Sequence, residues 1–214
     1  MMFTIRSGSM TAVIDSVGAQ LMSLQSVDGT QYLWQGDPKY WPDRSLTIFP
    51  YVARLTDGCY RYRGELYHMP IHGFAPTAEF SVAEQTDAAI TFVLESCPAF
   101  YEQYPFLFRY SIRYRLENAT LHVEITVENK DEKTMHFGLG GHPGINVPLE
   151  EGLRFEDYVI EVPPCQPRRM EFTPACFITG RELPFPMECN QLPLSHHMFD
   201  EDAIVLKGIP GEVT

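Results

Sequence analysis

Residues 108–139 read FRYSIRYRLENATLHVEITVENKDEKTMHFGL. Apolar and polar residues alternate through most of this stretch, and polar connections interrupt it at residues 117–119 and 129–131. Alternation with a period of two places the apolar side chains on one face of a strand. We therefore predict a three-stranded antiparallel meander over residues 108–116, 121–127 and 135–139, with one buried face.

The remainder of the chain also favours strands over helices. No segment shows a long apolar stripe with a period of 3.6 residues. Residues 35–65 and 161–193 are rich in proline, which cannot donate to a sheet ladder, so we expect loops or sheet edges there. The predicted fold class is all-β, as a sandwich or barrel, because many strands must cover their apolar faces. Further strands are expected near residues 3–5, 11–14, 20–24, 79–83 and 90–94.

Composition limits the function classes. The chain has 214 residues, with 16 Lys and Arg against 28 Asp and Glu. This acid excess argues against nucleic acid or an anionic membrane surface as a partner. No apolar run approaches the roughly 20 residues of a membrane span, and no signal-peptide pattern begins the chain, so a cytoplasmic protein is expected. With no repeat or linker, we expect one domain over residues 1–214.

Two of the seven histidines lie beside glycines, which allow a ligand or the backbone to approach closely. His72 lies in the sequence IHGFA, and His142 lies in GLGGHPG. A histidine can give or take a proton near neutral pH, so both are candidate catalytic residues. The alternative is that the glycines and proline only shape a turn and that His142 is an incidental polar residue.

Other candidates are an arginine and two aspartates. Arg54, in FPYVARL, could bind hydroxyl or carbonyl oxygens, or could be an ordinary surface arginine. Asp200 and Asp202, in FDEDAI, could accept hydrogen bonds from ligand hydroxyls, or could be the solvated start of a strand. The five cysteines lack zinc-site spacing, so no metal is expected.

The ordered segments of this chain resemble the aldose 1-epimerase (galactose mutarotase) superfamily, closest to its shorter bacterial branch. The likeness spans nearly the whole chain. It is carried by GAQL (18–21), YLWQGD (32–37), FPYVARL (49–55), HGFA (72–75), YPF (104–106), GGHP (140–143), FEDY (155–158) and residues 199–206.

The resemblance implies a large antiparallel β-sandwich that interconverts the α and β anomers of an aldose, with no metal or nucleotide cofactor. It implies that His142 donates a proton to the ring oxygen and that His72 holds the substrate near the same atom. Arg54 would bind sugar hydroxyls, and so would Asp202, or Asp200 in another alignment. Aromatic residues could stack on the sugar, and the candidates are Trp34, Trp41 and Phe74.

The sequence departs from the family at two places. The family's general base is a Glu near the C-terminus, and no segment matches it, because Glu212 has a different context. We therefore expect the family's last strands to be missing, a sheet edge and apolar face to be exposed, and turnover to fall about 10²–10⁴-fold. Pro76 stands where relatives commonly carry Arg.

Two other functions remain open. One is a non-catalytic carbohydrate-binding protein of the same fold. The other is a hexose-6-phosphate 1-epimerase, which would need Arg44, Arg61 or Arg63 to converge on a phosphate. In each case the partner would be a small-molecule sugar.

Overall fold

The computed structural model describes residues 1–200 and 203–211. It divides into two compact units, Met1–Asn146 and Val147–Thr214, and each unit is described by itself. Nearly all regular structure is antiparallel strand, which confirms the all-β prediction. The single domain expected over residues 1–214 stays a prediction. None of the helices among the described residues is long and apolar enough to cross a membrane.

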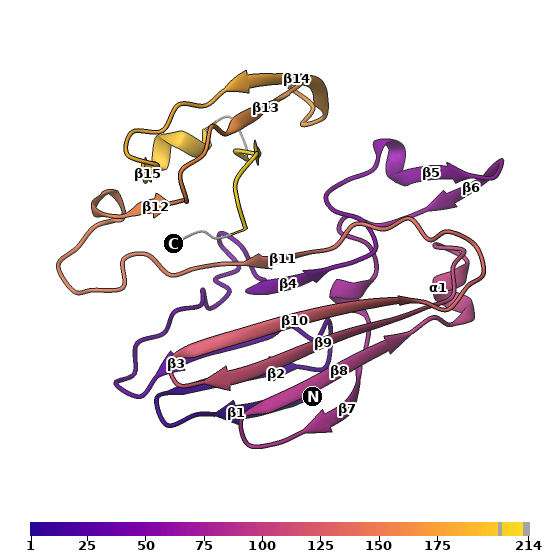
Figure 1. Ribbon diagram of the computed structural model, residues 1–214, viewed down its shortest axis with the longest axis horizontal. Coiled ribbons are helices and arrows are strands. Elements are labelled where there is room, and N and C mark those ends of the chain that lie inside the picture. Colours follow the sequence, from indigo (N-terminus) through magenta and orange to yellow (C-terminus); the bar gives the residue numbers. More distant parts are fainter. Residues whose placement is uncertain (201–202, 212–214) are drawn as a thin grey trace. The chain divides into compact units, whose positions relative to one another are not determined.

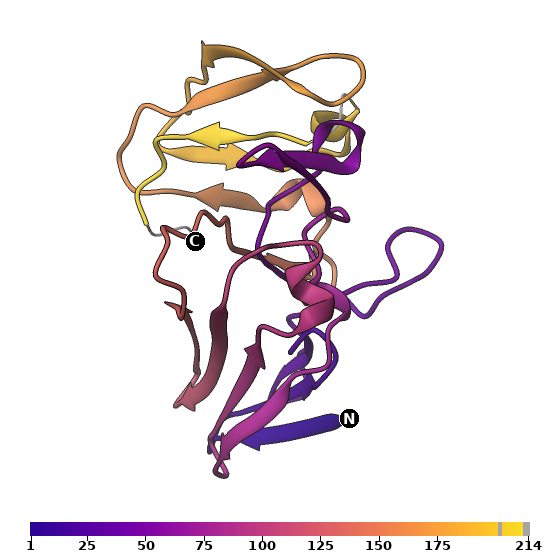
Figure 2. The same cartoon turned by 90° about the vertical axis from the view of Figure 1, so that its right-hand side faces the viewer.

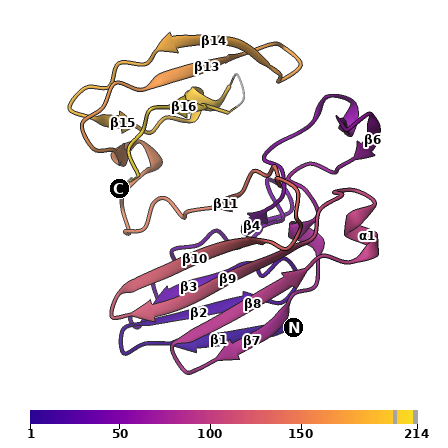
Figure 3. The same cartoon turned by 45° about the vertical axis from the view of Figure 1, so that its right-hand side comes forward.

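The first unit contains two main sheets that pack face to face as a sandwich, which Figures 1 and 3 show. One sheet has the strand order β1-β2-β3, and the other has the order β10-β9-β8-β7. Two further strand pairs, β11-β4 and β5-β6, lie outside these sheets. The strands are β1 (Met2–Arg6), β2 (Met10–Asp15), β3 (Leu21–Ser26), β4 (Ser45–Ile48), β5 (Cys59–Tyr62), β6 (Glu65–His68), β7 (Ser81–Gln85), β8 (Ala89–Glu95), β9 (Phe108–Glu117), β10 (Thr120–Asn129) and β11 (Gly140–Pro143).

Three short helices connect the strands of this unit. They are the 3-10 helices η1 (Thr56–Gly58) and η2 (Ala75–Thr77), and the α-helix α1 (Pro98–Tyr101).

The core of the sandwich is formed by the alternation that the sequence predicts. On β9 every second residue from Phe108 to Leu116 is buried, while the arginines between them are half-buried. These side chains meet Ile5 and Ile14 of the facing sheet. The hydroxyl of Tyr114 crosses the core and donates to the carbonyl oxygen of Ala19 at 2.8 Å, so the layers are also joined by a buried hydrogen bond.

The prediction of a third meander strand at residues 135–139 is wrong. Residues 135–139 form no strand, and the N–H of Gly138 donates to Pro50 O at 2.8 Å rather than to β10. The apolar alternation there arises because Met135 and Phe137 pack on the core from an extended loop. β10 therefore ends the strand order, and Val123 on it is 48% exposed.

The two proline-rich segments contain loops and strands at sheet edges, as expected, with the single exception of the central strand β13 (Arg168–Phe172). Residues 35–65 hold β4 and β5, and residues 161–193 hold most of the second unit's sheets. Pro184 and Pro193 each end a strand, where the missing N–H disturbs the ladder least.

The second unit, drawn in orange and yellow in Figure 2, has the sheets β12-β15 and β14-β13-β16. Its elements are the strands β12 (Val159–Glu161), β13 (Arg168–Phe172), β14 (Ile178–Pro184), β15 (Gln191–Pro193) and β16 (Leu206–Lys207), and the 3-10 helices η3 (Phe155–Asp157) and η4 (His196–Phe199).

Candidate functional site

His72 is held by the loop that follows β4. Its N–H donates to Ala53 O at 3.0 Å, and its carbonyl oxygen accepts the N–H of Phe49 at 3.3 Å. The N–H of Ala53 donates to Nδ1 of the His72 ring at 3.2 Å. These bonds tie the His72 backbone to the loop and orient its ring toward the Ala53 N–H.

The backbone around His72 adopts left-handed conformations. His72 has φ +65° and Ala53 has φ +69°, a region in which residues other than glycine are strained. The next residue, Gly73, has φ +78°, and a side chain there would collide with the carbonyl oxygen of Phe49. The glycine that marked His72 in the sequence is therefore required by the close approach of two loops.

His142 lies on β11, which pairs with β4 so that His142 is opposite Leu46. This register brings the exposed His142 ring to 5.5 Å from the His72 ring, centroid to centroid, and to 4.9 Å from the Trp41 ring. Residues from distant parts of the sequence thus form a pair of imidazoles beside an indole.

Trp41 is itself supported by its neighbours. The indole N–H of Trp34 donates to Trp41 O at 2.8 Å. A Cβ added to Gly144 would lie 2.8 Å from Trp34 Cβ and 3.0 Å from the Trp41 ring. The two tryptophans therefore need a glycine at position 144 in order to pack beside His142.

The electrostatics distinguish the two histidines. Partial burial lowers the pKa of His72 below its ordinary value, and the charge that His142 can carry lowers it further. Neutral His72 has one ring proton, and Nδ1 accepts the Ala53 N–H, so the proton must lie on Nε2. His72 can therefore donate one hydrogen bond to a ligand, while the exposed His142 can exchange a proton with one.

The remaining sequence-predicted residues fall in different units. Arg54 is exposed and directly follows Ala53, in the loop whose backbone bonds to His72. Asp200 lies in the second unit, where its carboxylate is 3.2 Å from Nδ1 of His197. Asp200 follows the helix η4 instead of beginning a strand, as was expected, and β16 starts only at Leu206. Asp202 lies outside the described residues.

Two of the three aromatic candidates lie at the histidine pair, and the third lies in the core. Trp41 contacts His142, and Trp34 supports Trp41. Phe74 is 4% exposed and stacks on Phe100, so it is a core residue and cannot stack on a sugar.

Sequence reasoning assigned no role to Ala53 or Gly144, which act through the backbone. The only sequence signal for close packing was the group of glycines at positions 140, 141 and 144. In the part of the chain that the structure describes, no cluster of three or more His, Cys, Asp or Glu residues could hold a metal ion.

The chain is thus a sandwich of antiparallel sheets that carries two neighbouring histidines on separate segments. The aldose 1-epimerase family model matches residues 1–188, and the chain belongs to this family. The family is of an isomerase type and acts on sugars.

Relatives of similar sequence and structure support this membership. The chain is 31% identical to the plasmid-encoded protein LacX of Lactococcus lactis subsp. lactis, covering 96% of this chain and 72% of LacX. It is 32% identical to a galactose mutarotase related enzyme from Lactobacillus acidophilus, with a TM-score of 0.90 over 96% of this chain and 69% of that one. A galactose mutarotase-like protein from Lactobacillus casei ATCC 334 is also 32% identical, with a TM-score of 0.89, over 96% and 71%. The fold therefore agrees with the family.

Proposed function

We propose that this chain is an aldose 1-epimerase, which interconverts the α and β anomers of a hexose by opening and closing its ring. The observation that carries the proposal is the pair of imidazoles, His72 and His142, with ring centroids 5.5 Å apart. Family membership and the mutarotase-like relatives supply the reaction class.

Ring opening and ring closure each need protons to move. On opening, the bond between C1 and the ring oxygen breaks, the ring oxygen takes a proton, and the C1 hydroxyl loses its proton as the carbonyl forms. Rotation about the C1–C2 bond and the reverse steps give the other anomer. A positioned proton donor contributes about 10²–10⁴-fold to such a step.

We assign the proton donor role to His142 and a hydrogen-bonding role to His72. His142 is exposed and can meet a substrate, whereas His72 is held neutral with its proton on Nε2. On this proposal Nε2–H of His72 donates to the ring oxygen and orients the sugar, and Arg54 binds hydroxyls of the same sugar. The proton of the C1 hydroxyl passes to water or a buffer base.

The observations favour an unphosphorylated sugar. Arg44 donates to Gln35 O at 3.0 Å, and Arg61 donates to Gly64 O at 3.4 Å. Arg63 lies over the Tyr62 ring, 5.4 Å from its centroid. The three guanidinium groups thus contact different partners, and none of these contacts joins two of the arginines at one place where a phosphate could bind.

Saturation-exchange NMR between the two anomers of each aldose in a panel tests the proposal. The wild type should accelerate exchange of at least one hexose, and His142→Ala should remove that acceleration while the sugar still binds. The matched control is His122→Ala, at a half-buried histidine on β10 whose Nε2 lies 3.6 Å from the Glu117 carboxylate, and it should leave exchange unchanged. Sugar binding without any acceleration by the wild type would instead support the non-catalytic carbohydrate-binding alternative.

A further inference from the structure

The indole of Trp41 lies beside the proposed proton donor. Its ring centroid is 4.9 Å from that of His142, and the two ring planes are tilted by 54°. The face of an aromatic ring carries negative charge density, so it attracts a cation that lies within about 6 Å of its centroid, and Trp does so most strongly. A protonated imidazole is such a cation, whereas a neutral imidazole gains much less from the contact. The contact can therefore distinguish the two protonation states of His142.

Trp41 belongs to a loop, residues 34–44, that hydrogen bonds hold closed. Arg44 donates to Gln35 O at 3.0 Å, and the Trp41 N–H donates to Asp37 O at 2.9 Å. The indole N–H of Trp34 donates to Trp41 O at 2.8 Å, and the Trp41 side chain is half-buried. The indole is thus in place beside His142 without a bound substrate.

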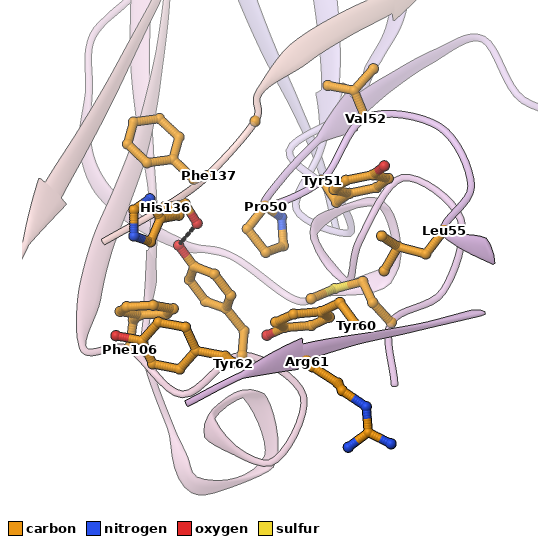
Figure 4. A pocket seen from close by; sticks show the side chains of 13 residues that line it. Pro50, Tyr51, Val52, Leu55, Tyr60, Arg61, Tyr62, Phe106, His136 and Phe137 are labelled. Atoms are coloured by element: carbon orange, nitrogen blue, oxygen red, sulfur yellow. Dashed lines mark hydrogen bonds between the residues drawn. The ribbon is translucent and has the colours of Figure 1, made fainter. Parts of the chain in front are cut away.

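The two imidazoles are also held close to each other. The segments that lead to them are joined by the hydrogen bond from Gly138 N–H to Pro50 O at 2.8 Å. Figure 4 shows these segments side by side, with Phe137 on one and Pro50 on the other. The first leads to His142 on β11, and the second leads to the N–H that binds the His72 ring. With ring centroids 5.5 Å apart, two positive charges would repel, so the pair holds one proton more readily than two.

No carboxylate of the surrounding elements is paired with His142. The strands β4 and β11 contain no Asp, Glu, Lys or Arg. The other titratable or charged side chains of the two loops beside them are Asp37, Lys39, Tyr40, Asp43, Arg44, Tyr51 and Arg54. Among the residues that the structure describes, the histidines in ion pairs are His122, His196 and His197. The titratable group that contacts the His142 ring is therefore His72.

We propose that Trp41 is a positioning residue that keeps the single proton of the histidine pair on His142 through a cation–π contact. This inference rests on the proposed function, in which His142 gives its proton to the ring oxygen. When the ring opens, the proton passes to that oxygen and His142 becomes neutral; when the ring closes, the same proton returns. Trp41 thus sets the pH range in which His142 carries the proton, while His72 stays neutral and donates from Nε2.

NMR titration of the histidine rings in the ligand-free protein tests the contact. Trp41→Leu should lower the titration midpoint of His142 by about half a pH unit, the shift expected for an exposed cation–π contact. Trp41→Phe should lower it less, because a phenyl ring keeps part of the charge density. If Trp41 only buried His142, Trp41→Leu would expose the ring and raise the midpoint, since burial disfavours the charged form. Tyr40→Leu, at an exposed ring one residue away, is the matched control and should leave the midpoint unchanged.

The pH dependence of anomer exchange tests whether the contact serves the reaction. The kcat/KM of the wild type should fall at high pH as His142 loses its proton. In Trp41→Leu this fall should begin about half a unit lower, which costs about threefold in rate above the midpoint and little below it. Trp41→Phe should restore part of the loss. An indole that only stacked on the sugar would raise KM at every pH and leave the profile in place.

The two proposals fail in different ways. A His142 midpoint that stays or rises in Trp41→Leu, or a pH profile that does not move with the midpoint, would overturn the role of Trp41 alone. Failure of the wild type to accelerate exchange of any sugar would overturn the proposed function, and the role of Trp41 in it, whatever the titration shows.

Discussion

Ala53 and His72 are joined by two reciprocal hydrogen bonds: the Ala53 N–H donates to Nδ1 of His72 at 3.2 Å, and the His72 N–H donates to Ala53 O at 3.0 Å. Both residues have positive φ, so each depends on the other to hold a strained backbone. The pairing selects the ring tautomer of His72, and the chemistry proposed for the site depends on that tautomer.

The first prediction concerns the protonation of His72. Burial and His142 lower its pKa, so an NMR titration should place its midpoint below the ordinary value of about 6.5. The variant His142→Ala should move the midpoint upward, because it removes a neighbouring positive charge. A midpoint that does not respond to His142→Ala would contradict the coupling between the two rings.

The same pKa has a consequence for stability. Above about pH 6.5 His72 is neutral in both the folded and the unfolded chain. As the pH falls below this value, the unfolded chain takes up the proton first, so the free energy of unfolding should decrease until the pH passes the lower folded pKa. Urea unfolding at several pH values, with His72→Gln as the comparison, measures the contribution of this one group.

The second prediction concerns Gly73. The substitution Gly73→Ala places a methyl group against Phe49 O at a positive φ, and should lower the free energy of unfolding by about 1–4 kcal/mol. Gly140→Ala is the matched control, because an added Cβ there meets nothing within 4 Å. Denaturant midpoints measure both effects, and equal losses in the two variants would refute the close approach of the loops.

A third prediction uses tryptophan fluorescence. The chain has two tryptophans, and both pack against Gly144. Gly144→Ala should displace Trp34 and Trp41, shift the emission spectrum, and lower anomer exchange by disturbing the ring beside His142. For Gly141→Ala, the nearest atom to the new Cβ is 3.9 Å away, so its emission should match the wild type. An unchanged spectrum for Gly144→Ala would be incompatible with this packing.

The fourth prediction concerns the proton of the C1 hydroxyl. The ion-paired histidines in the described part of the chain are His122, His196 and His197, so the His72 and His142 rings have no carboxylate paired with them there. If water or buffer takes the proton, exchange should rise with acetate concentration at constant pH and ionic strength. His142→Ala gives the background to subtract. An anomer exchange rate that does not change with acetate concentration would instead indicate that a base of the protein takes the proton.

The sequence predicted local structure well on strands, where the position of a residue along the strand decides which face its side chain lies on. β9 alternates as expected, because each residue's direction depends only on its place along the strand. The same reasoning failed at residues 135–139, since an extended loop that packs Met135 and Phe137 on a core produces the same alternation. Hydrogen-bond partners, which periodicity does not reveal, separate the two cases.

For the candidate site, too, some features follow from the sequence and others only from the tertiary structure. By itself, the sequence determined that His72 and His142 are each beside glycines, and that the chain resembles the aldose 1-epimerases. Only the tertiary structure decided that the two rings meet, that Ala53 selects the His72 tautomer, and that Trp41 lies beside His142. These relationships depend on the register between β4 and β11 and on the approach of two loops, which are set by contacts between residues far apart in the chain.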